Sequence, residues 1–313
     1  MPPALELMLA EHLSEDKVID LFIRLKKSDY TKEAYRHDIG TFQAFVGKPL
    51  NQVTLADALD YTEALKHRQI TDKRGRVKLL EDNSKRRMIN SVKSLYSFAF
   101  ESGFFKVNVM KAVKPPSAKS AVSSHILPET TVVKMIVLEE NPRNHAILYI
   151  LYASGLRVSE LCALRWRDVM RRADGCQLDI QSGKGDKQRH VFLPESAWKV
   201  LVGLRRSETA LDDYVFQSRQ KFNRFHERLD HQHIDKTHVF HIVREAAKRA
   251  GVENWNEVSP HWLRHCHGSH SIDRGAPLSV VRDTMGHANI STTNTYIQAR
   301  PGQSSAHFLV LNK

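Results

Sequence analysis

The stretch HWLRHCHGSH places four histidines and one arginine within residues 261–270. If the stretch is helical, the first two histidines share a face and so do the last two, because residues three or four apart are neighbours on a helix. Zinc-binding helices use such spacing. His261 and Arg264 are also three apart, and an imidazole beside a guanidinium suits a phosphate. The stretch therefore leaves a metal site and a phosphate site open.

Three further segments carry residues suited to phosphate chemistry. In ASGLRVSELCALRW, Gly155 interrupts a helical pattern, so Arg157 is expected at a helix end. SGKGDK holds Lys184 between two glycines, at the expected tip of a hairpin. MGHANISTTNTYI contains His287 and, nine residues later, Tyr296. Taken singly, each residue also fits an ordinary role as a surface charge, a turn residue or a packing aromatic.

The elements that must position these residues are mostly helical. In the second half the exception is a hairpin of two β-like runs, CQLDIQ at 176–181 and QRHVFL at 188–193. In the first half, apolar residues at helical spacing predict helices over 14–28, 31–47, 54–65 and 83–101. A basic loop or short hairpin, QITDKRGRVKLLED, separates the last two helices.

The helix predicted over 83–101 has one apolar face and one basic face. We expect five residues to point inward: Ile89, Val92, Leu95, Tyr96 and Phe98. Four are expected to point outward: Lys85, Arg86, Arg87 and Lys93.

The composition favours a polyanionic partner. Of 313 residues, 47 are Lys or Arg and 35 are Asp or Glu, a formal net charge of +12. The three cysteines, Cys162, Cys176 and Cys266, form no CxxC pair, which argues against a disulfide framework and a thiolate zinc site. There is no run of eighteen apolar residues and no basic, apolar leader. These features predict a soluble, intracellular protein.

In this order, the four segments resemble the catalytic set of the tyrosine recombinase or phage integrase family: Arg, Lys, His-x-x-Arg, His or Trp, and Tyr. The likeness includes flanking residues and covers most of residues 145–297. The matching positions are Arg157, Lys184, His261, Arg264, His287 and Tyr296.

The resemblance implies phosphoryl transfer without ATP, metal or other cofactor. The two arginines would bind the nonbridging oxygens, and the two histidines would donate a hydrogen bond or move a proton. By resemblance, Lys184 protonates the leaving 5′ oxygen, and Tyr296 attacks the scissile phosphate to form a 3′-phosphotyrosyl link. Glu160 either orients Arg157 by an ion pair or is a helix-surface acid. His265 and Cys266 are expected to support the site, and His270 to face away from it.

The resemblance also implies a mainly α fold in two domains. Residues 1–113 would be an N-terminal helical core-binding (SAM-like) domain that binds DNA. The stretch KPPSAKSAVSSH, residues 114–125, would be a linker. Residues 126–313 would be a mostly helical catalytic domain with a small antiparallel β-sheet and a C-terminal tail, 298–313. The segment from Thr71 to Asp82 departs from the family pattern and reads as an insertion that contacts DNA.

The implied partner is a double-stranded DNA recombination site, clamped between the two domains. The DNA-contact candidates are Lys73, Arg74, Arg76, Lys85, Arg86, Arg87 and Lys93. Four protomers would exchange strands through a Holliday junction, with possible accessory proteins, and residues 305–311 would dock on a neighbouring subunit or on their own domain. The setting would be the cytoplasm, at the nucleoid, of a bacterium, phage or mobile-element host, with no membrane contact.

Other functions stay open at this point. A type IB topoisomerase-like enzyme uses similar chemistry without synapsis, and a DNA-binding or architectural protein would need no chemistry. A metalloprotein could use the histidines, including a second cluster formed by His226, His231, His233, His238 and His241. Integration, excision, dimer resolution and transposition share one active site.

Overall fold

The computed structural model describes residues 14–71, 75–117, 125–181, 188–218 and 232–286. The chain divides into two compact units, Met1–Lys119 and Ser120–Lys313. The division falls within the proline- and serine-rich stretch 114–125. Within the described residues, every helix is too short or too polar to cross a membrane.

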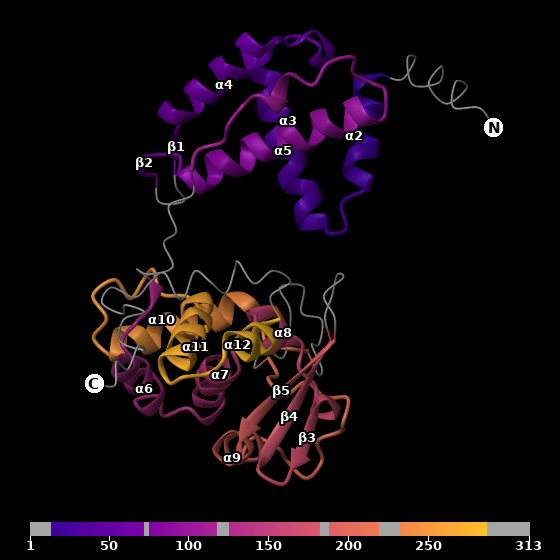
Figure 1. Ribbon diagram of the computed structural model, residues 1–313. Helices are drawn as coiled ribbons and strands as arrows, with labels where there is room; N and C mark the ends of the chain where they lie inside the picture. The colour runs from indigo at the N-terminus through magenta and orange to yellow at the C-terminus, as the bar shows by residue number, and fades with distance from the viewer. Residues whose placement is uncertain (1–13, 72–74, 118–124, 182–187, 219–231, 287–313) are drawn as a thin grey trace, which may run out of the picture. The chain divides into compact units, whose positions relative to one another are not determined.

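The first unit is a helical bundle with one small hairpin (Figure 1). All four helices predicted from the sequence are present, and the 69–82 segment contains two antiparallel strands. The elements are α2 (Glu15–Arg24), α3 (Asp29–Val46), η1 (Leu50–Gln52), α4 (Leu55–His67), β1 (Gln69–Thr71), β2 (Val77–Leu79), α5 (Asp82–Glu101) and η2 (Val109–Lys111).

The face of α5 that packs into the bundle is mostly as predicted. Ile89, Val92, Leu95 and Tyr96 are buried in the core of this unit. Lys85 was predicted to point outward, and this is wrong, because the residue is only 8% exposed. It lies one turn before Ile89 on the same helical stripe, so its apolar stem is covered while its ammonium reaches Asp82 at 3.0 Å.

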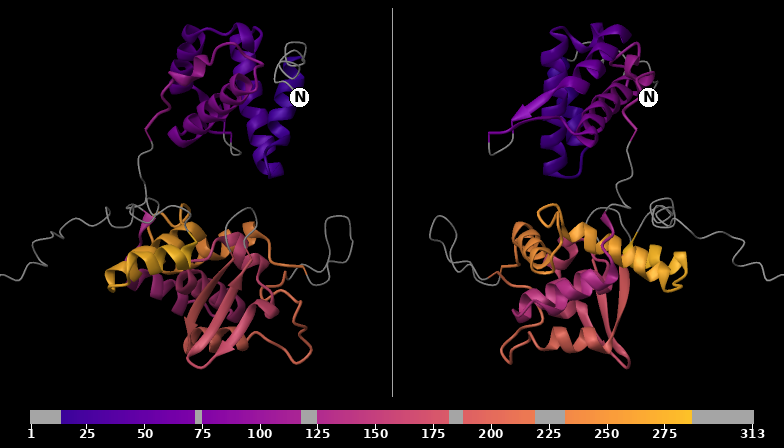
Figure 2. Two further views of the ribbon diagram at one scale, coloured as in Figure 1. Left: turned by 45° about the vertical axis from the view of Figure 1, so that its right-hand side comes forward. Right: turned by 90° about the vertical axis from the view of Figure 1, so that its left-hand side faces the viewer.

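The second unit places a three-stranded antiparallel sheet, in the order β3-β4-β5, beside a group of helices (Figure 1, Figure 2). Its helices are α6 (Glu129–Val137), α7 (Pro142–Ser154), α8 (Val158–Ala163), η4 (Trp166–Asp168), α9 (Glu195–Val202), α10 (Lys236–Arg249), α11 (Pro260–Asp273) and α12 (Leu278–Met285). Its strands are β3 (Val169–Arg172), β4 (Gly175–Ile180) and β5 (Arg189–Pro194).

Two of these strands were predicted from the sequence and one was not. Strands β4 and β5 pair antiparallel from Gly175–Pro194 to Ile180–Arg189. Strand β3 was not predicted, because it is a short edge strand in which two of the four residues are arginines. The mostly helical fold with a small antiparallel sheet is nevertheless confirmed.

The sheet and helices enclose the main apolar core of the second unit. Cys162, Cys176 and Cys266 lie in it as buried, free thiols. Burial raises the pKa of Cys162 and Cys176 to about 11 and that of Cys266 to about 12. All three therefore remain protonated and act as packing residues at neutral pH.

Candidate active site

Arg157 is held between two helices by a glycine turn. Helix α7 ends at Gly155, whose φ of 61° is left-handed, and Arg157 is the residue that precedes α8. A Cβ at residue 155 would lie 2.6 Å from the ring of His267, so the position excludes a side chain for both backbone and steric reasons. The predicted location of Arg157 at a helix end is confirmed.

Arg264 lies in the interior of the second unit. It is 2% exposed on α11. One terminal nitrogen of its guanidinium donates to the carbonyl of Gly155, and the other donates to the carbonyl of Met285 at 2.6 Å. The side chain therefore ties the end of α7 to the end of α12.

Three arginines converge on the C-terminal end of α12. The carbonyl of Thr284 accepts from Arg189 at 2.8 Å, and that of Gly286 accepts from Arg157 at 3.0 Å. Arg264 binds the carbonyl between them. The last carbonyls of a helix lack partners within the helix and carry partial negative charge, so they attract guanidinium groups.

Glu160 joins two of these arginines. Its carboxylate accepts from the backbone N–H and the Nη1 of Arg157, at 2.7 and 2.9 Å. It also accepts two bonds from Arg189, at 2.9 and 2.8 Å. Burial alone would raise the pKa of Glu160, but the hydrogen bonds and charges of the two arginines hold it below its usual value. Of the two readings of Glu160, the ion pair with Arg157 is the one observed.

His261 lies near the same arginines, on the first turn of α11. Desolvation, followed by the positive charges of Arg264, His125 and Arg157, lowers its pKa from the ordinary value of a histidine. The residue still reaches solvent. The lowered pKa favours the neutral imidazole, in which one nitrogen can donate and the other can accept.

The remaining residues of the histidine-rich stretch have packing partners. The Nδ1 of His267 lies 2.8 Å from the carbonyl of Tyr152, and burial lowers the pKa of His267 to about 4. His270 contacts the hydroxyl of Tyr152 at 2.9 Å and the carbonyl of Leu127 at 3.1 Å. The Sγ of Cys266 accepts from the backbone N–H of Leu127.

The described parts of the chain contain no group of three or more His, Cys, Asp or Glu residues placed to hold a metal ion. The ring of His265 lies 4.5 Å from that of His261, centroid to centroid, in an edge-on contact. His265 thus packs against His261, whereas Cys266 packs in the apolar core.

The structure thus brings Arg157, His261 and Arg264 together. Lys184, His287 and Tyr296 lie outside the described residues, as do Lys73 and Arg74. Sequence reasoning missed Arg189, for which a signal was present. Alternation along RHVFLP puts residue 189 on the core face with Val191 and Leu193, where an arginine requires a partner.

Several DNA-contact candidates of the first unit have internal partners. Arg87 pairs with the buried Asp38 at 2.6 Å. The ammonium of Lys93 donates to backbone carbonyls of η2 and the residues just after it, namely those of Met110, Lys111 and Val113. Arg76 is exposed on the β1–β2 hairpin, and Arg86 is half-buried on α5.

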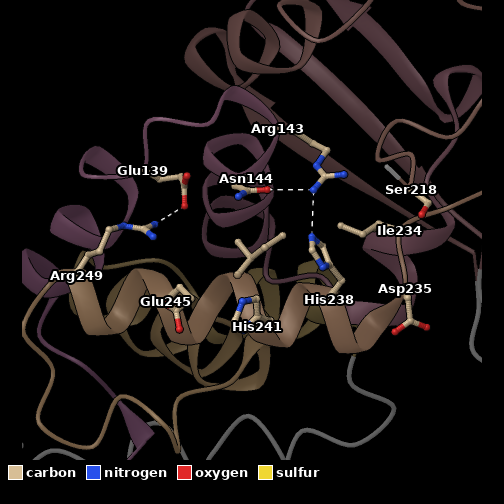
Figure 3. Close-up of a pocket in the computed structure, with 11 residues that line it drawn as sticks. Glu139, Arg143, Asn144, Ser218, Ile234, Asp235, His238, His241, Glu245 and Arg249 are labelled. Carbon is tan, nitrogen blue, oxygen red and sulfur yellow. Dashed lines mark hydrogen bonds and ion pairs between the residues drawn. The ribbon is translucent and has the colours of Figure 1, made fainter. Parts of the chain in front are cut away.

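A separate pocket of about 430 Å³ contains two members of the second histidine cluster (Figure 3). Arg143 contacts His238 across it at 3.2 Å, and Arg249 pairs with Glu139. His226 and His231 lie outside the described residues. Asp235 and Glu245 also line the pocket, alongside the ion pair of Arg249 with Glu139.

Comparisons with known proteins agree with this geometry. Residues 127–303 match the model of the phage integrase family. The chain is 31% identical over 294 residues to a "Tyrosine recombinase" of Thermosipho africanus, covering 90% of this chain and 95% of the relative. It is 28% identical over 293 residues to "Tyrosine recombinase XerC" of Anoxybacillus flavithermus, covering 88% and 89%.

Solved structures share the fold at lower identity. A lambda integrase dimer bound to a COC′ core site matches with a TM-score of 0.67 and 14% identity, covering 92% of this chain and 95% of that one. The XerH site-specific recombinase bound to a palindromic difH substrate matches with a TM-score of 0.65 and 17% identity, covering 86% and 76%.

Proposed function

The chain belongs to the phage integrase family of tyrosine recombinases, and we propose that it cuts and rejoins DNA through a covalent bond to Tyr296. It is a site-specific DNA recombinase. The observation that carries the proposed site is the convergence of Arg157 and Arg264 at the end of α12, directly before the segment that contains His287 and Tyr296.

The two arginines are suited to bind the scissile phosphate. Negative charge builds on the nonbridging oxygens as the phosphoryl group transfers, so fixed positive charge stabilises the transition state. A guanidinium stays protonated and offers a planar set of donors. Arg264 and Arg157 are fixed in advance by backbone carbonyls and by Glu160, so little reorganisation is required when the phosphate binds.

The proposed reaction is a reversible transesterification. The phenolic oxygen of Tyr296 passes its proton to His261 or His287 and forms a bond to phosphorus, the bond from phosphorus to the 5′ oxygen breaks, and Lys184 supplies the proton to that oxygen. His261 and His287 donate hydrogen bonds or relay a proton, and the neutral imidazole of His261 can do either. Attack by a 5′ hydroxyl on the phosphotyrosyl bond rejoins the strand. The phosphodiester energy is retained, so the chemistry requires no ATP.

The proposed partner is a pair of duplex recombination sites bound by four protomers, with strand exchange through a Holliday junction. The net charge of +12 and the exposed Arg76 support binding to DNA. We place the reaction in the cytoplasm at the nucleoid, where accessory proteins would select the sites, and assign residues 305–311 to a contact with a neighbouring subunit.

The test is capture of the covalent intermediate on a nicked suicide duplex that carries a site taken from DNA flanking the gene. Wild type is expected to yield a denaturant-resistant adduct in the presence of EDTA. Tyr296→Phe should bind the duplex with unchanged affinity and form no adduct, because it lacks only the nucleophilic oxygen.

A matched control is Tyr149→Phe, which removes an exposed hydroxyl of the same unit that bonds Ser196. This variant should form the adduct at the wild-type rate. An adduct that persists in Tyr296→Phe would assign the nucleophile to another residue.

A further inference from the structure

The interaction between Arg189 and Glu160 is the most extensively hydrogen-bonded ion pair that we find near the site. The side chains are 9% and 8% exposed, and two parallel bonds of 2.9 and 2.8 Å join guanidinium and carboxylate. The Nε of Arg189 donates a third bond to the carbonyl of Thr284. One side chain thus links β5, α8 and the end of α12.

The surrounding backbone is shaped to admit this arginine. A Cβ at Gly286 would lie 3.0 Å from both the Cδ and the Nη1 of Arg189. Gly286 also has a φ of 64°, in the left-handed region. A glycine at this position therefore ends α12 and leaves room for the guanidinium.

We propose that Arg189 is a positioning residue of the recombination reaction. It holds the Glu160 carboxylate that orients Arg157, and it fixes the end of α12, whose next carbonyls bind Arg264 and Arg157. The chain continues from Gly286 into His287 and on to Tyr296. Arg189 thereby aligns the phosphate-binding arginines with the segment that carries the nucleophile. This inference rests on the proposed function.

The planar fork of arginine is required for this role. A lysine would keep the charge but could not bind both carboxylate oxygens and the Thr284 carbonyl at once. Without Arg189, Glu160 would remain buried with Arg157 as its neighbour, and its pKa would rise, because burial disfavours the charged form. Arg165, Arg167, Asp168 and Asp179 line the same cavity as Glu160 and are the other charged groups of that lining.

The test compares Arg189→Gln and Arg189→Lys with the wild type in single-turnover cleavage of the suicide duplex. At saturating DNA, Arg189→Gln is expected to form the adduct roughly 100-fold more slowly, the size of effect that a small misalignment produces. Its dissociation constant for the duplex should not change. Arg189→Lys should form the adduct at a rate between those of the wild type and Arg189→Gln. The matched control is Arg171→Gln. Arg171 is an exposed arginine of the same sheet that pairs with Glu195, and this variant should cleave at the wild-type rate.

A pH profile separates positioning from a purely structural role. Because the pKa of Glu160 rises in Arg189→Gln, the cleavage rate of this variant should increase with pH more steeply than that of wild type. The double variant Glu160→Gln/Arg189→Gln should lose that extra dependence and be no slower than the slower single variant, since the two residues act as a unit.

The inference would be overturned if both folded Arg189 variants cleaved at the wild-type rate. It would also be overturned if the losses of rate in the Glu160 and Arg189 single variants added in the double variant and did not vary with pH. If Arg189→Gln does not fold by circular dichroism, Arg189→Lys carries the same test. Failure of the proposed function is a different result, because the wild type itself would then give no Tyr296-dependent adduct.

Discussion

Arg264 illustrates how a single charged side chain can be buried in this protein. The guanidinium is removed from water, but two backbone carbonyls from distant parts of the chain accept hydrogen bonds from it. Those carbonyls, in turn, end helices and would otherwise lack donors. At this scale, the site is built from guanidinium groups that donate hydrogen bonds to the carbonyls at the C-terminal ends of helices. The same hydrogen bonds hold the guanidinium groups in place to bind a phosphate.

The substitution Arg264→Lys is therefore expected to affect both stability and chemistry. A lysine cannot span Gly155 and Met285, so one buried carbonyl loses its donor, and the free energy of unfolding should fall by about 1–3 kcal/mol. Urea denaturation measures this loss, and the suicide duplex should show slower adduct formation.

Arg274→Lys is the matched control for that measurement. Arg274 follows the same helix and is 73% exposed, with Glu129 as its partner. A surface change of this kind should alter stability by no more than about 0.5 kcal/mol. Equal effects of the two substitutions would mean that the buried contacts of Arg264 contribute no more to stability than a surface pair does.

At the scale of elements, the turn between α7 and α8 sets the geometry of the site. Its Gly155 contributes a left-handed backbone, a carbonyl for Arg264 and a gap that the ring of His267 fills. Arg157 follows two residues later. The backbone conformation of this turn therefore fixes the position of Arg157 relative to Arg264, which lies on α11.

Gly155→Ala should destabilise the protein by more than the backbone strain alone. An alanine in the left-handed region costs about 1–2 kcal/mol, and the new Cβ would in addition meet the His267 ring at 2.6 Å. Thermal unfolding should show the loss, and adduct formation should slow because the acceptor of Arg264 moves.

Comparison with Gly251→Ala isolates the steric part of this effect. Gly251 has a φ of 83°, but a Cβ there meets no atom within 4 Å in the described structure. The Gly251→Ala variant should therefore lose only the stability that the left-handed backbone costs an alanine. If both variants melt at the same temperature, the contact with His267 is absent or readily relieved.

At the scale of the whole molecule, the basic residues have two roles: some bind groups within the protein, and others are predicted to contact DNA. The excess of 12 positive charges favours DNA, yet the ammonium of Lys93 and the guanidinium of Arg87 bind groups within the first unit. Charge count alone therefore overstates the number of phosphate contacts. Arg76 and Arg86 remain predicted contacts.

Salt dependence of DNA binding should distinguish these roles. The logarithm of the affinity should fall linearly with the logarithm of salt concentration, and Arg86→Gln should reduce the magnitude of this slope by about 1, as loss of one phosphate contact does. Lys93→Gln should leave the slope nearly unchanged and lower stability instead. Fluorescence anisotropy over a salt series measures the slope, and the reverse pattern would exchange the two assignments.

Local features of this protein were determined by the sequence itself. Helical spacing predicted the helices of the first unit, and alternation predicted β4 and β5. Gly155 predicted the break that positions Arg157. Each of these depends on neighbours within a turn or a strand, which hydrophobic periodicity and glycine conformation report directly. The order of the chemical residues along the chain carried the resemblance to the family.

The tertiary structure alone decided which distant groups meet. Arg189 lies 29 positions from Glu160 and 95 from Thr284, and Arg157 lies 129 from Gly286. No local pattern encodes such pairs. The burial of Lys85 and the choice between an ion pair and a surface acid for Glu160 were likewise settled by packing. A buried charge takes the partner that the folded chain brings within about 3 Å, and that partner is defined only once the helices and sheet have packed.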